Sequence, residues 1–176
     1  MLALTNLESV RTLMIEEVER DVASGALYRS PRLTEEGWAQ YADLLREAAR
    51  SQDDEWLKTE INRRGLIKPL EQRRTKSGFT MVRVPYTAAE TLAEGEFNRY
   101  YVRAVCRFVL EQGGEQVTIY RAKAVEQPRY ESEIRIGKQI GAQALLDDLR
   151  ATSNADMNTA LGVPAGPNSG LSVRWP

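Results

Sequence analysis

Residues 97–125 read FNRYYVRAVCRFVLEQGGEQVTIYRAKAV, and this stretch decides the fold. Its first half places four apolar residues at helical spacing, namely Phe97, Tyr101, Ala104 and Phe108. Gly113 and Gly114 then break the pattern, and residues 117–125 have the composition of a strand. We therefore expect a helix, a glycine turn and a strand, with that strand forming a hairpin against a second strand over residues 79–84.

The composition and the net charge limit the classes to which the protein can belong. The chain has 176 residues, of which 42% are hydrophobic and 28% charged, so it can form one core of ordinary domain size. Its net charge of −1 provides no overall field that would attract nucleic acid or an anionic membrane. No apolar run approaches the ~20 residues that a membrane-spanning helix needs, which excludes the integral membrane class.

The residues that most enzymes rely on are scarce. The chain has no histidine and one cysteine, Cys106, which lies among apolar residues and is expected in the core. With no secretory signal and no disulfide, we expect an intracellular protein. In the segment YRAK, Arg121 occupies the position where metal nucleases carry a carboxylate. Glu90, Glu94 and Glu96 could gather a magnesium ion, but helix starts commonly collect glutamates. We expect no enzyme, no catalytic residue, no cofactor and no metal site.

Three helices are expected in residues 1–65. Apolar residues recur at steps of three and four over residues 6–23, and Thr5 with Glu8 has the spacing of a capping box. A second helix follows Thr34 and ends near Arg50, and a third, shorter helix ends before Gly65.

Residues 66–150 mix strand and helix. A strand over residues 79–84 ends at Pro85, and Thr87 with Glu90 marks the start of the long central helix. Gly95 either kinks this helix or divides it in two. A last short helix carries an apolar side formed by Leu145, Leu146 and Leu149.

The final residues, 151–176, contain many glycines and prolines and are expected to form an extended arm beyond a single domain of residues 1–150. Within the arm Leu171, Val173 and Trp175 alternate, which a purely disordered tail seldom shows. The fold class is thus α+β, with N-terminal helices and a long central helix packed on a small, mainly antiparallel sheet.

A row of arginines, Arg99, Arg103 and Arg107, repeats every four residues along the central helix. Three readings stay open: a solvated face with ion pairs inside the helix, a docking stripe for another chain, and contacts with nucleic-acid phosphates. As a docking surface, the row and its surroundings give these candidate interface residues: Arg99, Tyr100, Arg103, Arg107, Arg121, Lys123, Leu171, Val173 and Trp175. A second basic group, Arg73, Arg74 and Lys76, lies in a segment expected to be a loop and could contact phosphates.

Three segments, FNRYYVRAVCR, YRAKAV and GPNSGLSVRWP, resemble small proteins of unassigned activity encoded among the virion structural genes of tailed bacteriophages and prophages. The resemblance is best over residues 95–176 and brings no catalytic residue. It implies an auxiliary virion protein, capsid-associated as a cement or head-stabilising component, made in the host cytoplasm and then part of the virion. Its partners would be copies of itself and other virion proteins such as the major capsid protein. The alternative is a DNA-handling enzyme or accessory factor that contacts phosphates through its basic residues.

Overall fold

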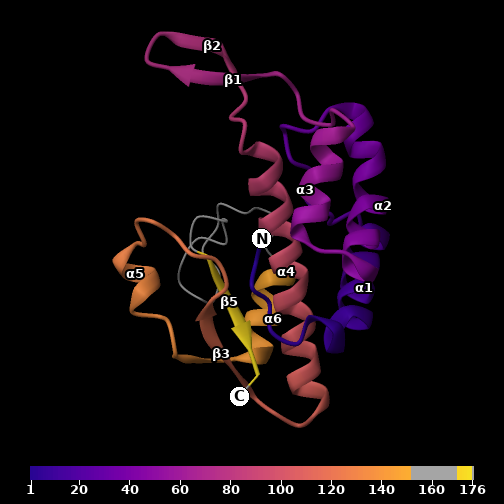
Figure 1. The fold of residues 1–176 in the computed structure, drawn as a ribbon, viewed down its shortest axis with the longest axis vertical. Helices are drawn as coiled ribbons and strands as arrows, with labels where there is room; N and C mark the ends of the chain where they lie inside the picture. Colours follow the sequence, from indigo (N-terminus) through magenta and orange to yellow (C-terminus); the bar gives the residue numbers. More distant parts are fainter. Residues whose placement is uncertain (152–169, 176) are drawn as a thin grey trace.

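The computed structural model describes residues 1–151 and 170–175 and shows an α+β fold, as the sequence predicts (Figure 1). The elements follow in the order α1 (Leu7–Ser24), α2 (Glu35–Ser51), α3 (Asp54–Arg63), β1 (Leu70–Thr75), β2 (Gly78–Arg83), α4 (Ala88–Glu111), β3 (Gln116–Arg121), α5 (Tyr130–Glu133), β4 (Gln139–Gly141), α6 (Ala142–Ala151) and β5 (Leu171–Arg174). The predicted arm over residues 152–169 lies outside the described residues.

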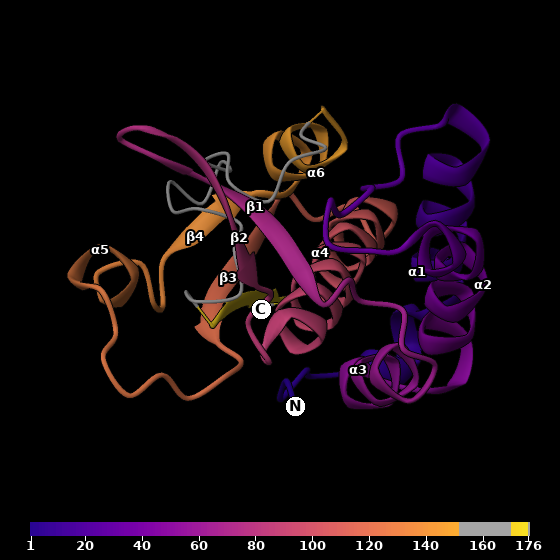
Figure 2. The same ribbon diagram turned by 90° about the horizontal axis from the view of Figure 1, so that it is seen from above.

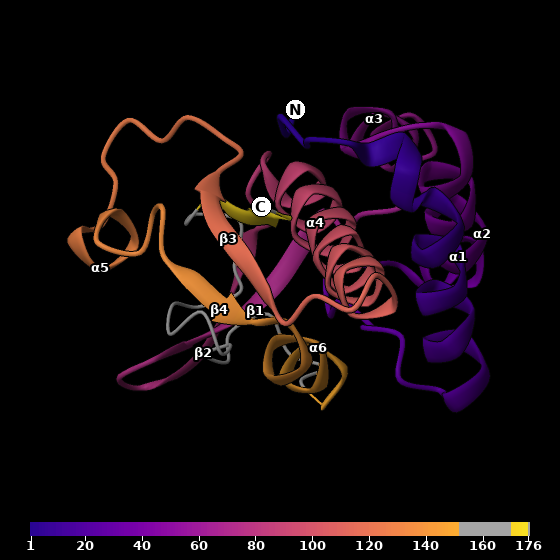
Figure 3. The same ribbon diagram turned by 90° about the horizontal axis from the view of Figure 1, so that it is seen from below.

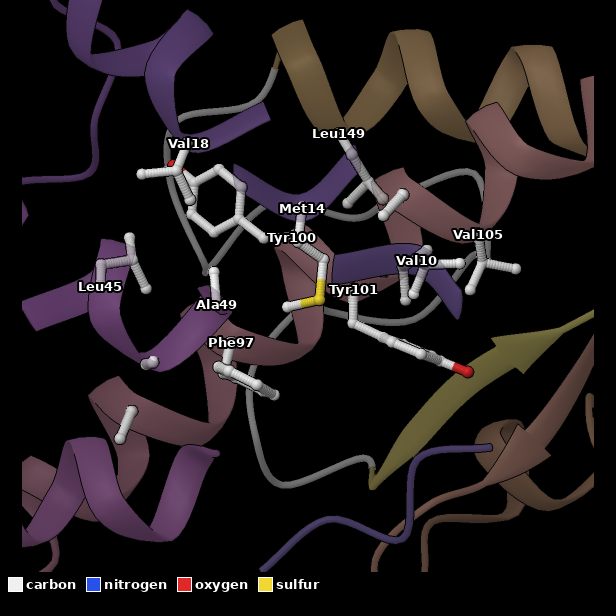
Figure 4. Packing of buried hydrophobic residues seen from close by; sticks show 14 of the residues in the cluster. Val10, Met14, Val18, Leu45, Ala49, Phe97, Tyr100, Tyr101, Val105 and Leu149 are labelled. Carbon is white, nitrogen blue, oxygen red and sulfur yellow. The ribbon is translucent and has the colours of Figure 1, made fainter. Parts of the chain in front are cut away.

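Helix α4 is the centre of the molecule. Helices α1, α2 and α3 lie on one side of it, and α6 and the sheet that contains β3 lie on the other (Figures 2 and 3). The core therefore forms around α4, with side chains from α1, α2, α4 and α6 (Figure 4). Because neighbours cover α4 on several sides, Phe97, Tyr101 and Cys106 are all fully buried.

Two small antiparallel sheets form instead of the single hairpin expected from the sequence. Strand β3 lies in the middle of the order β4-β3-β5, and Ile119 faces Val173 in its register with β5. Among the described residues strand β2 pairs only with β1, so the prediction that residues 117–125 form a hairpin with residues 79–84 is wrong. Pairing partners are set by the packing of distant segments, which local sequence patterns do not report.

The β1–β2 hairpin projects from one end of the molecule, beyond the start of α4 (Figure 1). Its base is held to the body by the paired guanidinium of Arg32 and carboxylate of Glu71, whose closest atoms are 2.6 Å apart. The amide of Lys68 also donates to the Arg32 carbonyl at 2.8 Å. The hairpin is thus anchored at its base and solvent-exposed along most of its length.

Helix ends follow the sequence signals only in part. Thr34 caps α2, since its side chain accepts from the amide of Gly37 at 2.9 Å. The proposed capping box at Thr5 is wrong, because α1 begins after Asn6, whose backbone is left-handed with φ 56°. Thr87 precedes α4 without a side-chain cap, and α4 runs unbroken through Gly95. Among the described residues, no helix is both long and apolar enough to cross a membrane.

Candidate functional site

The arginine row of α4 is directed into the protein. Arg103 is fully buried, and its guanidinium donates to Glu17 at 2.8 Å and to Asp21 at 2.6 and 2.9 Å. Tyr100 completes the group, since its hydroxyl donates to Asp21 at 2.8 Å while the Arg103 guanidinium lies 5.0 Å from its ring centre. The two carboxylates come from α1, so this cluster joins α1 to α4.

Glu17 is the acidic centre to which several cations converge. It accepts hydrogen bonds from Arg103 of α4, from Arg107 of α4 at 3.3 Å and from Arg150 of α6 at 3.0 Å. Burial alone would raise the pKa of Glu17, but the hydrogen bond from Arg150 and the charge of Arg103 outweigh it and lower the pKa. One carboxylate thereby links three helices.

The remaining arginine of the row, Arg99, is also largely buried, and it donates to the backbone carbonyl of Leu149 in α6 at 2.8 Å. The reading of the row as a docking stripe for another chain is therefore wrong for Arg99 and Arg103. The interpretation as a solvated face is wrong for these two residues as well, because both are buried. Of the three arginines, only Arg107 is partly exposed and pairs with a glutamate, Glu111, one turn further along the same helix. Most of the acidic complement comes from α1, far away in the sequence, while Glu96 and Glu111 of α4 pair with Arg99 and Arg107 within the helix.

The last described residues lie within the molecule and do not form an arm to another chain. Leu171 and Val173 are buried in β5, and the Asn98 side chain donates to the Leu171 carbonyl at 2.9 Å. The ring of Trp175 packs on Phe108 of α4, with ring centres 4.7 Å apart. For residues 171–175 the prediction of an extended arm is wrong, because their apolar side chains find a place between β3 and α4.

The other two cations of the predicted interface also have partners in the chain. Arg121 pairs with Glu133, the last residue of α5. Lys123 pairs with Glu90 at 2.7 Å and with Glu94. Two of the three glutamates considered for a magnesium ion thus hold an ammonium group, and no group of metal-ligating side chains is found in the described residues.

A buried acidic group on α4 has no full complement of partners. Glu96 is enclosed where α4 packs on α1 and α2, and its Oε1 is 3.8 Å from the Arg99 guanidinium. Within the described part of the chain, its Oε2 and the hydroxyl of Tyr41 form no hydrogen bond. Burial raises the pKa of Glu96 to about 7, because the attraction of Arg99 is too weak to compensate for lost hydration. The thiol of Cys106 is fully buried, and burial raises its pKa to about 12, which favours the protonated form over the reactive thiolate.

One of the two exposed apolar surfaces of the described residues is on the β1–β2 hairpin. Residues that face each other across an antiparallel pair share one side, and the register places Leu70 opposite Arg83, Gln72 opposite Met81 and Arg74 opposite Phe79. We call these six residues the hairpin face. Phe79 is 67% exposed, Met81 58% and Leu70 44%, so three large apolar side chains on one side of a narrow ribbon meet solvent.

The hairpin is also a local concentration of positive charge. Residues 68–86 hold five of the 24 basic residues and one of the 25 acidic residues, so they carry +4 while the rest of the chain carries −5. In the part of the chain that the structure describes, Arg73, Arg74, Lys76 and Arg83 form no ion pair, whereas Arg103 and Arg107 of the body do. The sequence identified the first three of these cations but placed them in a loop, since β1 lacks an apolar alternation.

A second exposed apolar group surrounds α5. Tyr130 is 75% exposed, Ile134 42% and Ile136 39%, and we call residues 126–136 the α5 segment. Its only anchoring ion pair among described residues is that between Arg121 and Glu133. Sequence reasoning assigned no role to this segment.

No family model matches the sequence, and no match was found among the curated proteins or the solved structures.

Proposed function

We propose that this chain is a structural or assembly protein of a tailed-phage virion, associated with the capsid as a cement or head-stabilising component and acting through protein–protein contacts. The resemblance of residues 95–176 to proteins encoded among virion genes supports the virion setting. The binding role is supported by the hairpin face, whereas the surface first expected from the arginine row and the last residues is used inside the chain.

The hairpin face is the observation that carries the proposal. A two-stranded ribbon is marginally stable in water, yet this one leaves Leu70, Phe79 and Met81 uncovered on one side. Burying one such side chain in an interface is worth about 1.5–3 kcal/mol, so a protein surface that covers the ribbon would stabilise both the contact and the hairpin. Large exposed apolar patches are typical of protein interfaces.

Nucleic-acid binding is the second candidate, and the free cations of the hairpin favour it. Arg73, Arg74, Lys76 and Arg83 have no ion-pair partner in the described residues and could contact phosphates. The −5 charge on the rest of the chain would repel a nucleic acid that extends beyond the hairpin. Binding to phosphates also gives no reason for the exposed apolar residues of the hairpin face. We therefore place this function second.

The experiment compares incorporation into particles. Wild type, the double variant Phe79→Ser with Met81→Ser, and the control Thr80→Ser on the opposite side of the same strand are each supplied during particle production. Mass spectrometry of purified particles then gives their copy number. We expect the double variant to be depleted at least ~10-fold and the control to match wild type. A ~10-fold depletion corresponds to a loss of about 1.4 kcal/mol of binding free energy.

Two outcomes would overturn the proposal. One is absence of the wild-type chain from particles, and the other is equal incorporation of all three proteins. If the chain instead binds double-stranded DNA with an affinity that falls steeply and log-linearly with salt, and Arg73→Gln with Arg74→Gln abolishes this binding, the second function is correct.

A further inference from the structure

The large apolar side chains that are exposed gather at two places. Apart from Met1, all of those in the described residues lie either at the hairpin or in the α5 segment. Four belong to the hairpin and the residues that follow it, namely Leu70, Phe79, Met81 and Tyr86, and three belong to the α5 segment, namely Tyr130, Ile134 and Ile136. In an assembly protein with two separate apolar surfaces, one surface of a copy can bind the other surface of a second copy.

The two surfaces do not meet within one molecule. The hairpin projects from one end, while α5 lies lower along the side, and both are on the opposite side of α4 from α1 (Figures 1 and 2). In this arrangement neither surface covers the other, and both stay available to a second copy.

Charge decides which surfaces of two copies can meet. Two hairpins packed against each other would bring together two groups of charge +4, and such like-charge contact costs free energy. The α5 segment carries −1, from three glutamates and two arginines, on a chain body that carries −5. Glu126 and Glu131 belong to the α5 segment and form no ion pair in the described residues, so they can accept from Arg74 and Arg83 of a neighbouring hairpin.

We propose that the hairpin face of one copy docks on the α5 segment of a second copy of this chain. This rests on the proposed assembly function and names its partner. Leu70, Phe79 and Met81 cover Tyr130, Ile134 and Ile136 of the next copy, and the hairpin cations face the acidic body around them. Each copy carries both surfaces, so two copies can exchange the contact reciprocally in a dimer, or the contact can repeat head-to-tail and close into a ring or continue as a filament.

Complementation between two variants tests the contact. The hairpin variant carries Phe79→Ser with Met81→Ser, and the segment variant carries Tyr130→Ser with Ile134→Ser. All four positions are exposed, so each variant is expected to unfold at the same temperature as wild type. Thr80→Ser and Gln143→Ser serve as matched controls at exposed positions outside the two surfaces. Association is measured by sedimentation velocity and native mass spectrometry over a range of concentrations.

We expect wild type and both controls to associate, and each variant alone to stay monomeric. An equimolar mixture of the two variants should form a dimer with one copy of each, because the intact hairpin of the segment variant meets the intact segment of the hairpin variant. A wild type that associates while the mixture stays monomeric overturns this contact.

A second measurement does not depend on weakened variants. A Met81→Cys copy mixed with an Ile134→Cys copy should give a covalent heterodimer with a short bifunctional maleimide, whereas Cys106 is buried and stays unmodified. Absence of this product also overturns the contact. Wild type that is monomeric at every concentration, combined with hairpin-dependent incorporation into particles, would leave the proposed function in place and assign the hairpin to a different virion protein.

Discussion

Glu96 should make the stability of this protein fall as the pH rises through neutrality. Its pKa is about 7 in the folded state against 4.5 for an ordinary glutamate. A folded-state pKa above the unfolded value means that the folded protein holds the proton more tightly, so the stabilisation is complete below about pH 4.5 and is lost as the pH passes 7. A difference of about 2.5 units at about 1.36 kcal/mol per unit gives a loss of about 3 kcal/mol between pH 4.5 and pH 8.

The variant Glu96→Gln isolates this effect because glutamine has nearly the same shape and never ionises. Urea unfolding, followed by tryptophan fluorescence, would be measured for both proteins at pH 4.5 and pH 8. We expect the wild type to lose about 3 kcal/mol more than the variant, and the variant to be the more stable protein at pH 8. Burial also raises the pKa of Asp54 and Glu94, but both proteins share these groups, so their contribution cancels in the comparison.

Two results would refute the reasoning. Equal pH dependence in the two proteins would mean that the pKa of Glu96 is the same in the folded and in the unfolded protein. A wild type that becomes more stable relative to the variant as the pH rises would mean that the folded protein holds Glu96 in its ionised form through Arg99, in spite of the separation of 3.8 Å.

Three further substitutions test the packing through urea unfolding at pH 7. Arg103→Leu should lower the free energy of unfolding by about 3–5 kcal/mol, because Glu17 and Asp21 would then stay buried without this cation, and a loss below ~1 kcal/mol would contradict the cluster. Leu171→Ala should cost about 2–5 kcal/mol because β5 is part of the core, whereas a free arm would lose almost nothing. Gly37→Ala should destabilise by about 1–3 kcal/mol, since the added Cβ would lie 2.5 Å from the backbone carbonyl oxygen of Leu66. Unchanged stability would show that the backbone moves enough to relieve this contact.

The helices could be predicted because their signals are local. The stripe formed by Val10, Met14 and Val18 reports the buried side of α1 directly, and all three residues are fully buried. The exact starts were less predictable, since α1 begins after a left-handed Asn6 and not with the expected capping box.

The sheets could not be predicted to the same degree. The strand character of β3 was visible, but its partners are β4 and β5, and β5 lies beyond a long intervening segment. Strand β1 was missed because its residues, LEQRRT, are mostly polar and exposed on both sides. Only the turn that ends in Gly78, whose φ is 143°, marks the hairpin in the sequence.

The candidate interface was assigned to the wrong residues, because the regular spacing of the arginines in α4 does not show which elements pack against them. Arg99, Arg103 and Arg107 look like a charged face when the helix is taken alone, yet α1 supplies Glu17 and Asp21 to the same side. One warning was available, since Tyr100 and its neighbours make α4 apolar on more than one side, and such helices are buried. The exposed apolar residues of the hairpin became recognisable only once its register was known.

The position of β5 has a consequence for the order of folding during synthesis. Strand β3 is the middle strand of its sheet, but the residues that complete one of its edges, 171–174, are synthesised after all the other described helices and strands. Helices α1 to α4 can associate earlier through contacts that are closer in sequence. Ile119 and the adjoining face of α4 stay uncovered until Val173 has been synthesised. A nascent chain therefore carries an uncovered edge of β3 until residues 171–174 have been synthesised, and such an unpaired edge exposes it to aggregation and to chaperones.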